Sequence, residues 1–110
     1  MNKELADRWV MALRSGKYKQ GIGKLRDFND NFCCLGVLCD ILEMKVGKDI
    51  EAYNYGGRVG KFPIELVPVL KTHEGCLVLN GRDTHLARLN DKGLNFSEIA
   101  DIIERHWEEL

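Results

Sequence analysis

The hydrophobic positions of this chain follow helical spacing at both ends and form an unbroken run in the middle. Near the amino terminus an apolar stripe predicts an amphipathic helix, with Asn2 as its cap and Gly16 as its stop. The residues of the stripe are Leu5, Ala6, Trp9, Ala12 and Leu13. Because its other positions are polar, this helix is expected to bury one face and expose the other.

The central run reads CCLGVLCD from Cys33 to Asp40, and it has no charged residue before Asp40. Two helical turns without a solvated face predict a buried helix around which the other elements pack. We expect this helix to extend to about Lys45 and to end at Gly47.

The last helix has the clearest local signature in the chain. Asn95 is placed as its cap, Glu98 follows three residues later, and Leu94 and Ile99 form a hydrophobic staple. The buried stripe of this helix is Phe96, Ile99, Ala100, Ile103 and Trp107.

The segments between these helices predict a small β component. Residues 17–32 favour a hairpin around an Asn/Asp turn, and Cys76–Leu79 favours a strand that pairs with it. Residues 48–62 favour a loop or mobile ribbon. A short helix is expected from Pro63 to Leu70, and another, capped by Asp83, through Asn90 to a stop at Gly93. The fold class is therefore α+β: a central buried helix, amphipathic terminal helices and a small antiparallel sheet or hairpin.

Composition supports one domain over residues 1–110, because 45% hydrophobic and 30% charged residues are an ordinary globular balance. The polar start of the chain lacks the apolar segment of a signal peptide, and no stretch is long enough to span a membrane. We therefore expect a cytoplasmic protein. Its four cysteines are then expected to be reduced thiols that pack as small hydrophobes.

A net charge of −1 argues against binding to a nucleic acid duplex. The charges are nevertheless uneven, since residues 14–26 are mainly basic and residues 98–109 mainly acidic. Two solvated faces explain this pattern most simply, although the two segments could also meet within one molecule or between copies. The Phe96–Ala100 region is similar to the supporting helix of a helix-turn-helix, but too little chain follows for a recognition helix.

Metal binding is not expected, because no Cys-x-x-Cys pair is present and Cys34 and Cys39 point to different sides of a helix. Cys33 begins the central helix, where the helix dipole favours a thiolate, and His85 could complete a nucleophilic pair. The apolar neighbours of Cys33 favour plain packing instead.

Two segments are candidate ligand sites. The Gly81–His85 turn gathers a guanidinium, a carboxylate and an imidazole, which suits an anion but equally suits a capped turn. The Tyr53–Arg58 segment offers aromatic faces and a guanidinium on a Gly-rich backbone, as for stacking a base and holding a phosphate, although any exposed loop can carry tyrosines. The candidate residues are Tyr53, Tyr55, Arg58, Arg82, Asp83 and His85.

Three blocks of sequence resemble a family of small tailed-bacteriophage accessory proteins. They are ALRSGKYKQ at 12–20, CCLGVLCD at 33–40, and LARLNDKG at 86–93 leading into FSEIA at 96–100. The resemblance omits residues 44–80 and brings no catalytic residues with it. It implies a setting in an infected bacterium, where small phage proteins often act on host defence or metabolism by binding.

These features together predict a noncatalytic counter-defence protein of the host bacterial cytoplasm that sequesters a small nucleotide-type signal. One alternative is an inhibitor that binds a host protein through the basic segment or the acidic last helix. The other is a small enzyme of nucleotide chemistry that uses Cys33 or His85. No cofactor is predicted, and a homo-oligomer is expected.

Overall fold

A computed structural model describes residues 1–55, 69–71 and 75–110 of the chain. Its helices are α1 (Lys3–Arg14), α2 (Cys34–Ile41), α3 (Leu86–Asp91) and α4 (Phe96–His106), followed by the 3₁₀ turn η3 (Trp107–Glu109). Its strands are β1 (Lys19–Gln20), β2 (Arg26–Asp27), β3 (Asn31–Phe32), β4 (Val46–Lys48), β5 (Ala52–Tyr55), β6 (Cys76–Leu79) and β7 (Arg82–His85). The α+β fold class is confirmed.

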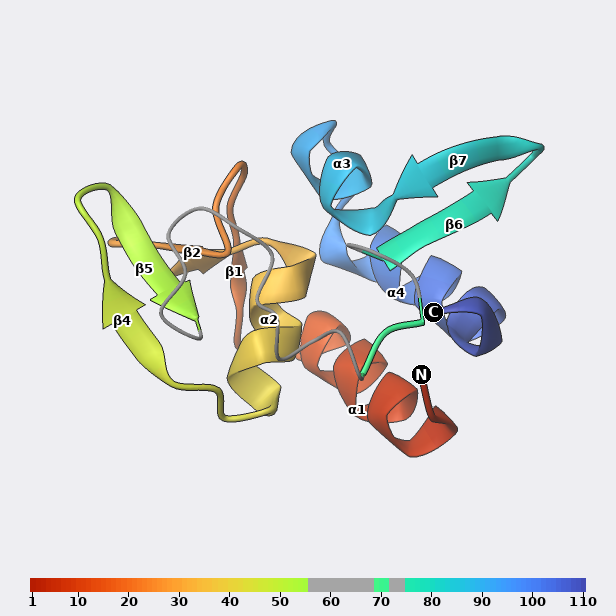
Figure 1. The fold of residues 1–110 in the computed structure, drawn as a ribbon, viewed down its shortest axis with the longest axis horizontal. Helices are drawn as coiled ribbons and strands as arrows, with labels where there is room; N and C mark the ends of the chain where they lie inside the picture. Colours follow the sequence, from red (N-terminus) through yellow and green to blue (C-terminus); the bar gives the residue numbers. More distant parts are fainter. Residues whose placement is uncertain (56–68, 72–74) are drawn as a thin grey trace.

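The helices α1, α2 and α4 occupy the middle of the molecule, and the strands lie at its two ends (Figure 1). At one end a five-stranded sheet has the order β1-β3-β2-β5-β4. At the other end β6 and β7 form a two-stranded hairpin that leads into α3. No helix among the described residues has the length and apolar character needed to cross a membrane.

The predicted hairpin at residues 17–32 is confirmed as the antiparallel pair β2 and β3. The Asp27 carboxylate shapes its turn, because Oδ1 accepts hydrogen bonds from the backbone N–H of Asn29 at 2.8 Å and of Asn31 at 3.0 Å. The sheet is larger than the sequence predicted. β1 adds to β3 in parallel, and the β4–β5 hairpin extends the opposite side through β2.

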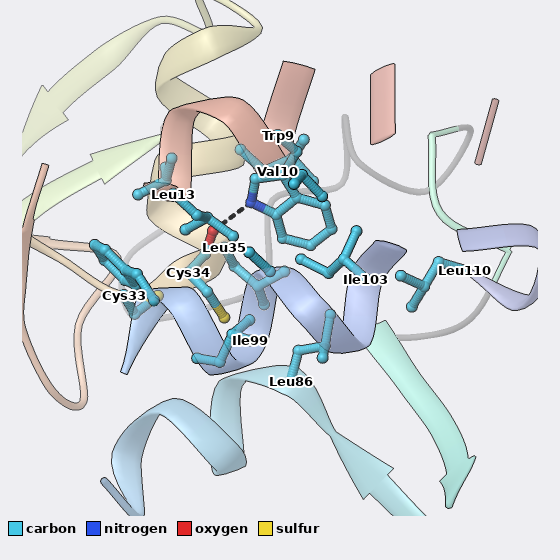
Figure 2. Close-up of a cluster of buried hydrophobic side chains, with 14 of the residues drawn as sticks. Trp9, Val10, Leu13, Cys33, Cys34, Leu35, Leu86, Ile99, Ile103 and Leu110 are labelled. Atoms are coloured by element: carbon cyan, nitrogen blue, oxygen red, sulfur yellow. Dashed lines mark hydrogen bonds between the residues drawn. The ribbon is translucent and has the colours of Figure 1, made fainter. Parts of the chain in front are cut away.

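The core forms around α1, which packs against α4 on one side and against α2 on another (Figure 2). Residues Cys34 to Cys39 of α2 are all buried, as the uncharged run predicted. Trp9 of α1 is fully buried, and its indole N–H donates a hydrogen bond of 2.9 Å to the carbonyl of Cys34. This bond satisfies the polar edge of a large apolar side chain and fixes α1 against the start of α2.

The predicted end of the central helix is wrong. α2 ends at Ile41 with Leu42 as its C-cap, and Glu43 then takes a left-handed backbone conformation with φ of 55°. The chain reverses here because the N–H groups of Glu43 and Met44 bond back to the last carbonyls of the helix. Gly47 consequently lies in β4, opposite Asn54 of β5, and does not stop a helix.

The expectation of a loop over residues 48–62 is also wrong for Ala52–Tyr55, which form β5. Burial explains the strand, since Asn54 and Tyr55 are both buried against the rest of the fold. Residues 56–62 lie outside the described residues, as does most of the helix expected from Pro63 to Leu70.

The strand at Cys76–Leu79 is confirmed, but its predicted partner is wrong. β6 pairs with β7, the segment that immediately follows it. Asn80 and Gly81 connect the strands with φ of 52° and 76°, the backbone that a two-residue hairpin turn requires. Asp83 therefore lies in β7 opposite Val78 and caps no helix. α3 begins at Leu86, and Gly93 follows its end with φ of 109° as expected.

The capping box of the last helix is confirmed. The Asn95 side chain accepts a hydrogen bond from the Glu98 N–H at 2.9 Å, and the Glu98 carboxylate accepts from the Asn95 N–H at 3.1 Å. Asn95→Ala removes one of these bonds and should lower the free energy of unfolding by about 1 kcal/mol. Urea denaturation would measure the change, with exposed Ser97→Ala as the control. A stability equal to that of the control would contradict the cap.

The basic segment and the acidic helix meet within one molecule through Arg14. Its guanidinium forms ion pairs of 2.5 Å with Asp101 and 2.6 Å with Glu104. The two carboxylates raise the pKa of Arg14 through hydrogen bonds. Since all three side chains are exposed, the pairs orient α1 and α4 and add little stability.

Candidate functional site

The six candidate residues do not converge on one site. Tyr53 and Tyr55 lie on β5, whereas Arg82, Asp83 and His85 lie on β7 at the opposite end of the molecule (Figure 1). Arg58 lies outside the described residues. The two predicted segments therefore do not form a common site.

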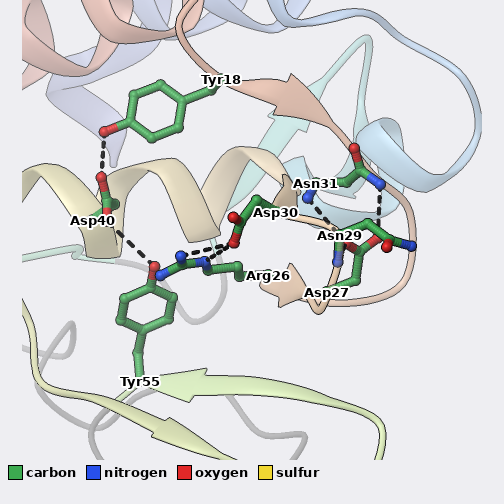
Figure 3. Close-up of polar contacts among 8 residues, drawn as sticks. All are labelled: Tyr18, Arg26, Asp27, Asn29, Asp30, Asn31, Asp40 and Tyr55. Atoms are coloured by element: carbon green, nitrogen blue, oxygen red, sulfur yellow. Dashed lines mark hydrogen bonds and ion pairs between the residues drawn. The ribbon is translucent and has the colours of Figure 1, made fainter.

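Tyr55 is fully buried and holds the sheet against α2 (Figure 3). Its hydroxyl lies 3.5 Å from Oδ1 of Asp40, while the Tyr18 hydroxyl donates to Oδ2 of the same carboxylate at 2.5 Å. Burial raises the pKa of Tyr55 to about 12, and burial together with the bond to Asp40 raises the pKa of Tyr18 as well. Both phenols stay neutral hydrogen-bond donors, which gives Tyr55 a structural role.

Tyr53 is half-buried and already contacts other side chains. The guanidinium carbon of Arg26 lies 4.5 Å from the centre of its ring, and Phe28 packs edge-on at 5.1 Å. Arg26 in turn pairs with Asp30 at 2.7 Å. A base could stack on Tyr53 only by displacing part of this cluster, so the β5 segment is a poor ligand platform.

The β7 segment adjoins a hollow of about 280 Å³ at the junction of β7 and α3. His85 lines it together with residues from α3 and its C-cap. These residues are Ala87, Arg88, Asp91 and Lys92. Arg88 and Lys92 are exposed, so their charged groups can reach a ligand in the hollow.

The charge of this hollow favours an anion. Asp91 is its carboxylate, and Oδ1 of Asp91 already accepts hydrogen bonds from the Gly23 N–H at 2.9 Å and from the Asn90 amide at 3.3 Å. The Arg88 guanidinium and the Lys92 ammonium carry two positive charges. They outnumber the single negative charge of Asp91, which already accepts two hydrogen bonds. A phosphate or carboxylate group can therefore bind here with a gain in electrostatic energy.

Sequence reasoning identified His85 but missed Arg88 and Lys92. Positions 85, 88 and 92 are spaced by three and four residues, which places them on one face of a helical turn. This spacing could have identified Arg88 and Lys92 as neighbours of His85 from the sequence. The sequence also grouped Arg82 with His85, but these residues pair with Leu79 and Cys76 respectively and thus lie on opposite faces of the hairpin. Asp83 shares the face of His85.

The central cysteines are poorly suited to nucleophilic chemistry. Burial raises the pKa of Cys33 to about 11, and burial also raises the pKa of Cys34. The Cys33 sulfur instead accepts a hydrogen bond from the Gly36 N–H at 3.4 Å as the N-cap of α2. Residues 1–55, 69–71 and 75–110 contain no group of three side chains that could hold a metal ion.

Comparison with known proteins gives a family without an assigned role. The model of a domain of unknown function, DUF8296, matches residues 1–59. The chain belongs to this family. No curated protein and no solved structure matches it. The DUF8296 match spans α1 to β5 and thus includes the Tyr18–Asp40–Tyr55 cluster, whereas the hollow beside α3 lies beyond the matched residues.

Proposed function

We propose that this chain is a noncatalytic binding protein that sequesters a small anionic ligand of the nucleotide type. The observation that carries the proposal is the hollow at the β7–α3 junction, where Arg88 and Lys92 stand beside His85. An arginine presents a planar fork that can hold two phosphate oxygens, and a lysine adds a compact positive charge. The imidazole supplies a third polar group for the same ligand.

The volume of the hollow limits how much of a ligand it can enclose. Sites that enclose a whole drug-sized molecule measure roughly 300–1,000 Å³. At about 280 Å³ this hollow suits a phosphate-bearing end of a ligand, with the remainder lying across the surface of α3. The candidate nucleophile Cys33 does not support turnover, because burial raises its pKa to about 11.

The resemblance of the three sequence blocks to tailed-phage accessory proteins supports a role in counter-defence. In that setting the protein would act in the cytoplasm of the infected bacterium, as a homo-oligomer, by removing a nucleotide signal from the host. Native mass spectrometry of protein purified from infected cells would report both the number of copies and a retained ligand.

The double variant Arg88→Gln/Lys92→Gln should weaken ligand binding at least tenfold, because each lost charged contact is worth about 1.5 kcal/mol or more. Isothermal titration calorimetry against cyclic nucleotides, ADP-ribose and nucleoside monophosphates would measure it. A ligand that binds should also raise the melting temperature at saturation. Lys17→Gln, an exposed charge distant in sequence, is the matched control.

Two outcomes contradict the proposal. One is the absence of binding heat and of any melting shift across the whole panel. The other is binding with equal affinity by the double variant and the wild type. Either would leave the inhibitor of a host protein as the hypothesis to pursue.

A further inference from the structure

A cysteine and a histidine face each other across the β6–β7 hairpin. Cys76 and His85 are directly opposed partners in the antiparallel register. Opposed residues of such a pair project to the same face of the sheet, with their Cβ atoms about 4.5–5.5 Å apart. Both side chains are half-buried, so they lie at the margin of the core and not within it. The sequence had paired His85 with Cys33, but the register places Cys76 opposite it.

The imidazole of His85 is available to a neighbour. Its Nδ1 is buried and has no hydrogen-bond partner among the described residues. A buried, unsatisfied polar atom is costly, and it needs an explanation such as a transient or functional partner. The Cys76 thiol across the hairpin makes no such bond in the structure, but it is the neighbour of suitable chemistry, since a thiol can donate its proton to a ring nitrogen.

The surroundings of His85 favour an anion, since the hollow holds Arg88 and Lys92 against the single carboxylate of Asp91. Arg88 and Lys92 line the same hollow as His85. Positive groups stabilise a thiolate, and they also attract reagents that carry carboxylates. Cys76 is half-buried, whereas Cys33 and Cys34 are buried in apolar surroundings.

We propose that Cys76 and His85 form a thiol–imidazole pair and that Cys76 is a site of covalent modification by small anionic disulfides. His85 takes the thiol proton, and the thiolate sulfur of Cys76 attacks one sulfur of the disulfide. A new S–S bond forms while the old one breaks. A basic departing thiolate takes the proton from the imidazolium, whereas a weakly basic one leaves as the thiolate and the imidazolium gives its proton to water. The exchange produces a mixed disulfide and one free thiol, without any other oxidant. It does not depend on nucleotide binding.

The test is the reaction of the folded protein with dithiobis(nitrobenzoate), an anionic disulfide whose released thiolate is coloured. One thiol per chain is expected to react rapidly at pH 7, and all four only after unfolding. Cys76→Ser should abolish the rapid phase. His85→Gln should slow it about tenfold, because the attacking thiolate becomes scarcer. His106→Gln is the matched control, since His106 is also half-buried but pairs with Glu109 at 3.5 Å.

The role of the hollow is tested separately. Arg88→Gln should lower the rate of reaction of Cys76 with the anionic reagent several-fold more than the rate of its reaction with the uncharged disulfide dithiodipyridine. The wild-type protein should also react several-fold faster than a peptide that carries residues 75–80, a comparison that does not depend on the stability of any variant.

Three results would overturn the proposal. They are a rapid phase that survives in Cys76→Ser, equal rates for His85→Gln and the wild type, and a wild-type rate no faster than that of the peptide. Nucleotide binding can succeed or fail independently, since calorimetry measures it without labelling the thiol.

Discussion

Gly36→Ala is expected to lower the free energy of unfolding by at least about 3 kcal/mol, the largest loss from one added methyl group among the glycines that the structure describes. A Cβ atom at position 36 would lie 1.8 Å from the carbonyl oxygen of Leu25 and 2.6 Å from its carbonyl carbon. That carbonyl cannot move freely, because it accepts a hydrogen bond of 3.2 Å from the Cys33 N–H at the start of α2. Relief of the clash must therefore separate α2 from the chain just before β2.

The expected loss of stability in Gly36→Ala is opposite in sign to the effect of the same substitution in an unhindered helix. In an unhindered helix, replacement of glycine by alanine raises stability by about 1 kcal/mol. Urea denaturation of Gly36→Ala would measure the change, and exposed Ser97→Ala in α4 is the benign control. Equal or greater stability of Gly36→Ala would show that α2 does not pack against the Leu25 carbonyl.

Asn90→Ala is expected to cost about 3 kcal/mol, because one buried amide joins three distant segments. Its Oδ1 accepts hydrogen bonds from the Gln20 amide at 2.9 Å and from the Cys34 N–H at 3.2 Å. Its Nδ2 donates to the Gly21 carbonyl at 2.8 Å. Alanine would leave the buried Cys34 N–H and the half-buried Gly21 carbonyl without this partner.

Urea denaturation of a second asparagine variant distinguishes the loss of the Asn90 hydrogen bonds from a general effect of removing an asparagine. Asn29→Ala removes an exposed asparagine side chain in the β2–β3 turn and should change stability by less than about 0.5 kcal/mol. Asn90 itself is 1% exposed. Equal losses in the two variants would contradict the role of Asn90 as a buried connection between α3, β1 and α2.

The two ends of the chain and its central helix were predictable because their signals are local. The Asn2 side chain accepts from the Leu5 N–H at 2.8 Å, and the Asn95 capping box spans three residues. Helical periodicity and caps involve neighbours in sequence, so no knowledge of the rest of the fold is needed to recognise them. Burial of the cysteine-rich run was equally readable, because no charged residue interrupts it.

The strands and their partners were much harder to predict. β1, β2 and β3 have two residues each, too few to show an alternating pattern. The β4–β5 hairpin replaced a predicted helix end and a predicted loop because Tyr55 gains burial against Asp40 and α2, a contact between distant segments. Asp83 had the residue type of a helix cap, but pairing with Val78 placed it in a strand.

The sequence by itself determined the helical frame and the burial of Cys33 and Cys34, since each depends on residue type and local spacing. It predicted a turn at Gly81–His85, but Arg82–His85 form β7. Only the tertiary structure decided that Tyr55 is part of the core, that Arg88 and Lys92 share a hollow with His85, and that Cys76 faces this histidine. These arrangements depend on strand register and on the packing of α3, which arise from the burial of residues far apart in the chain.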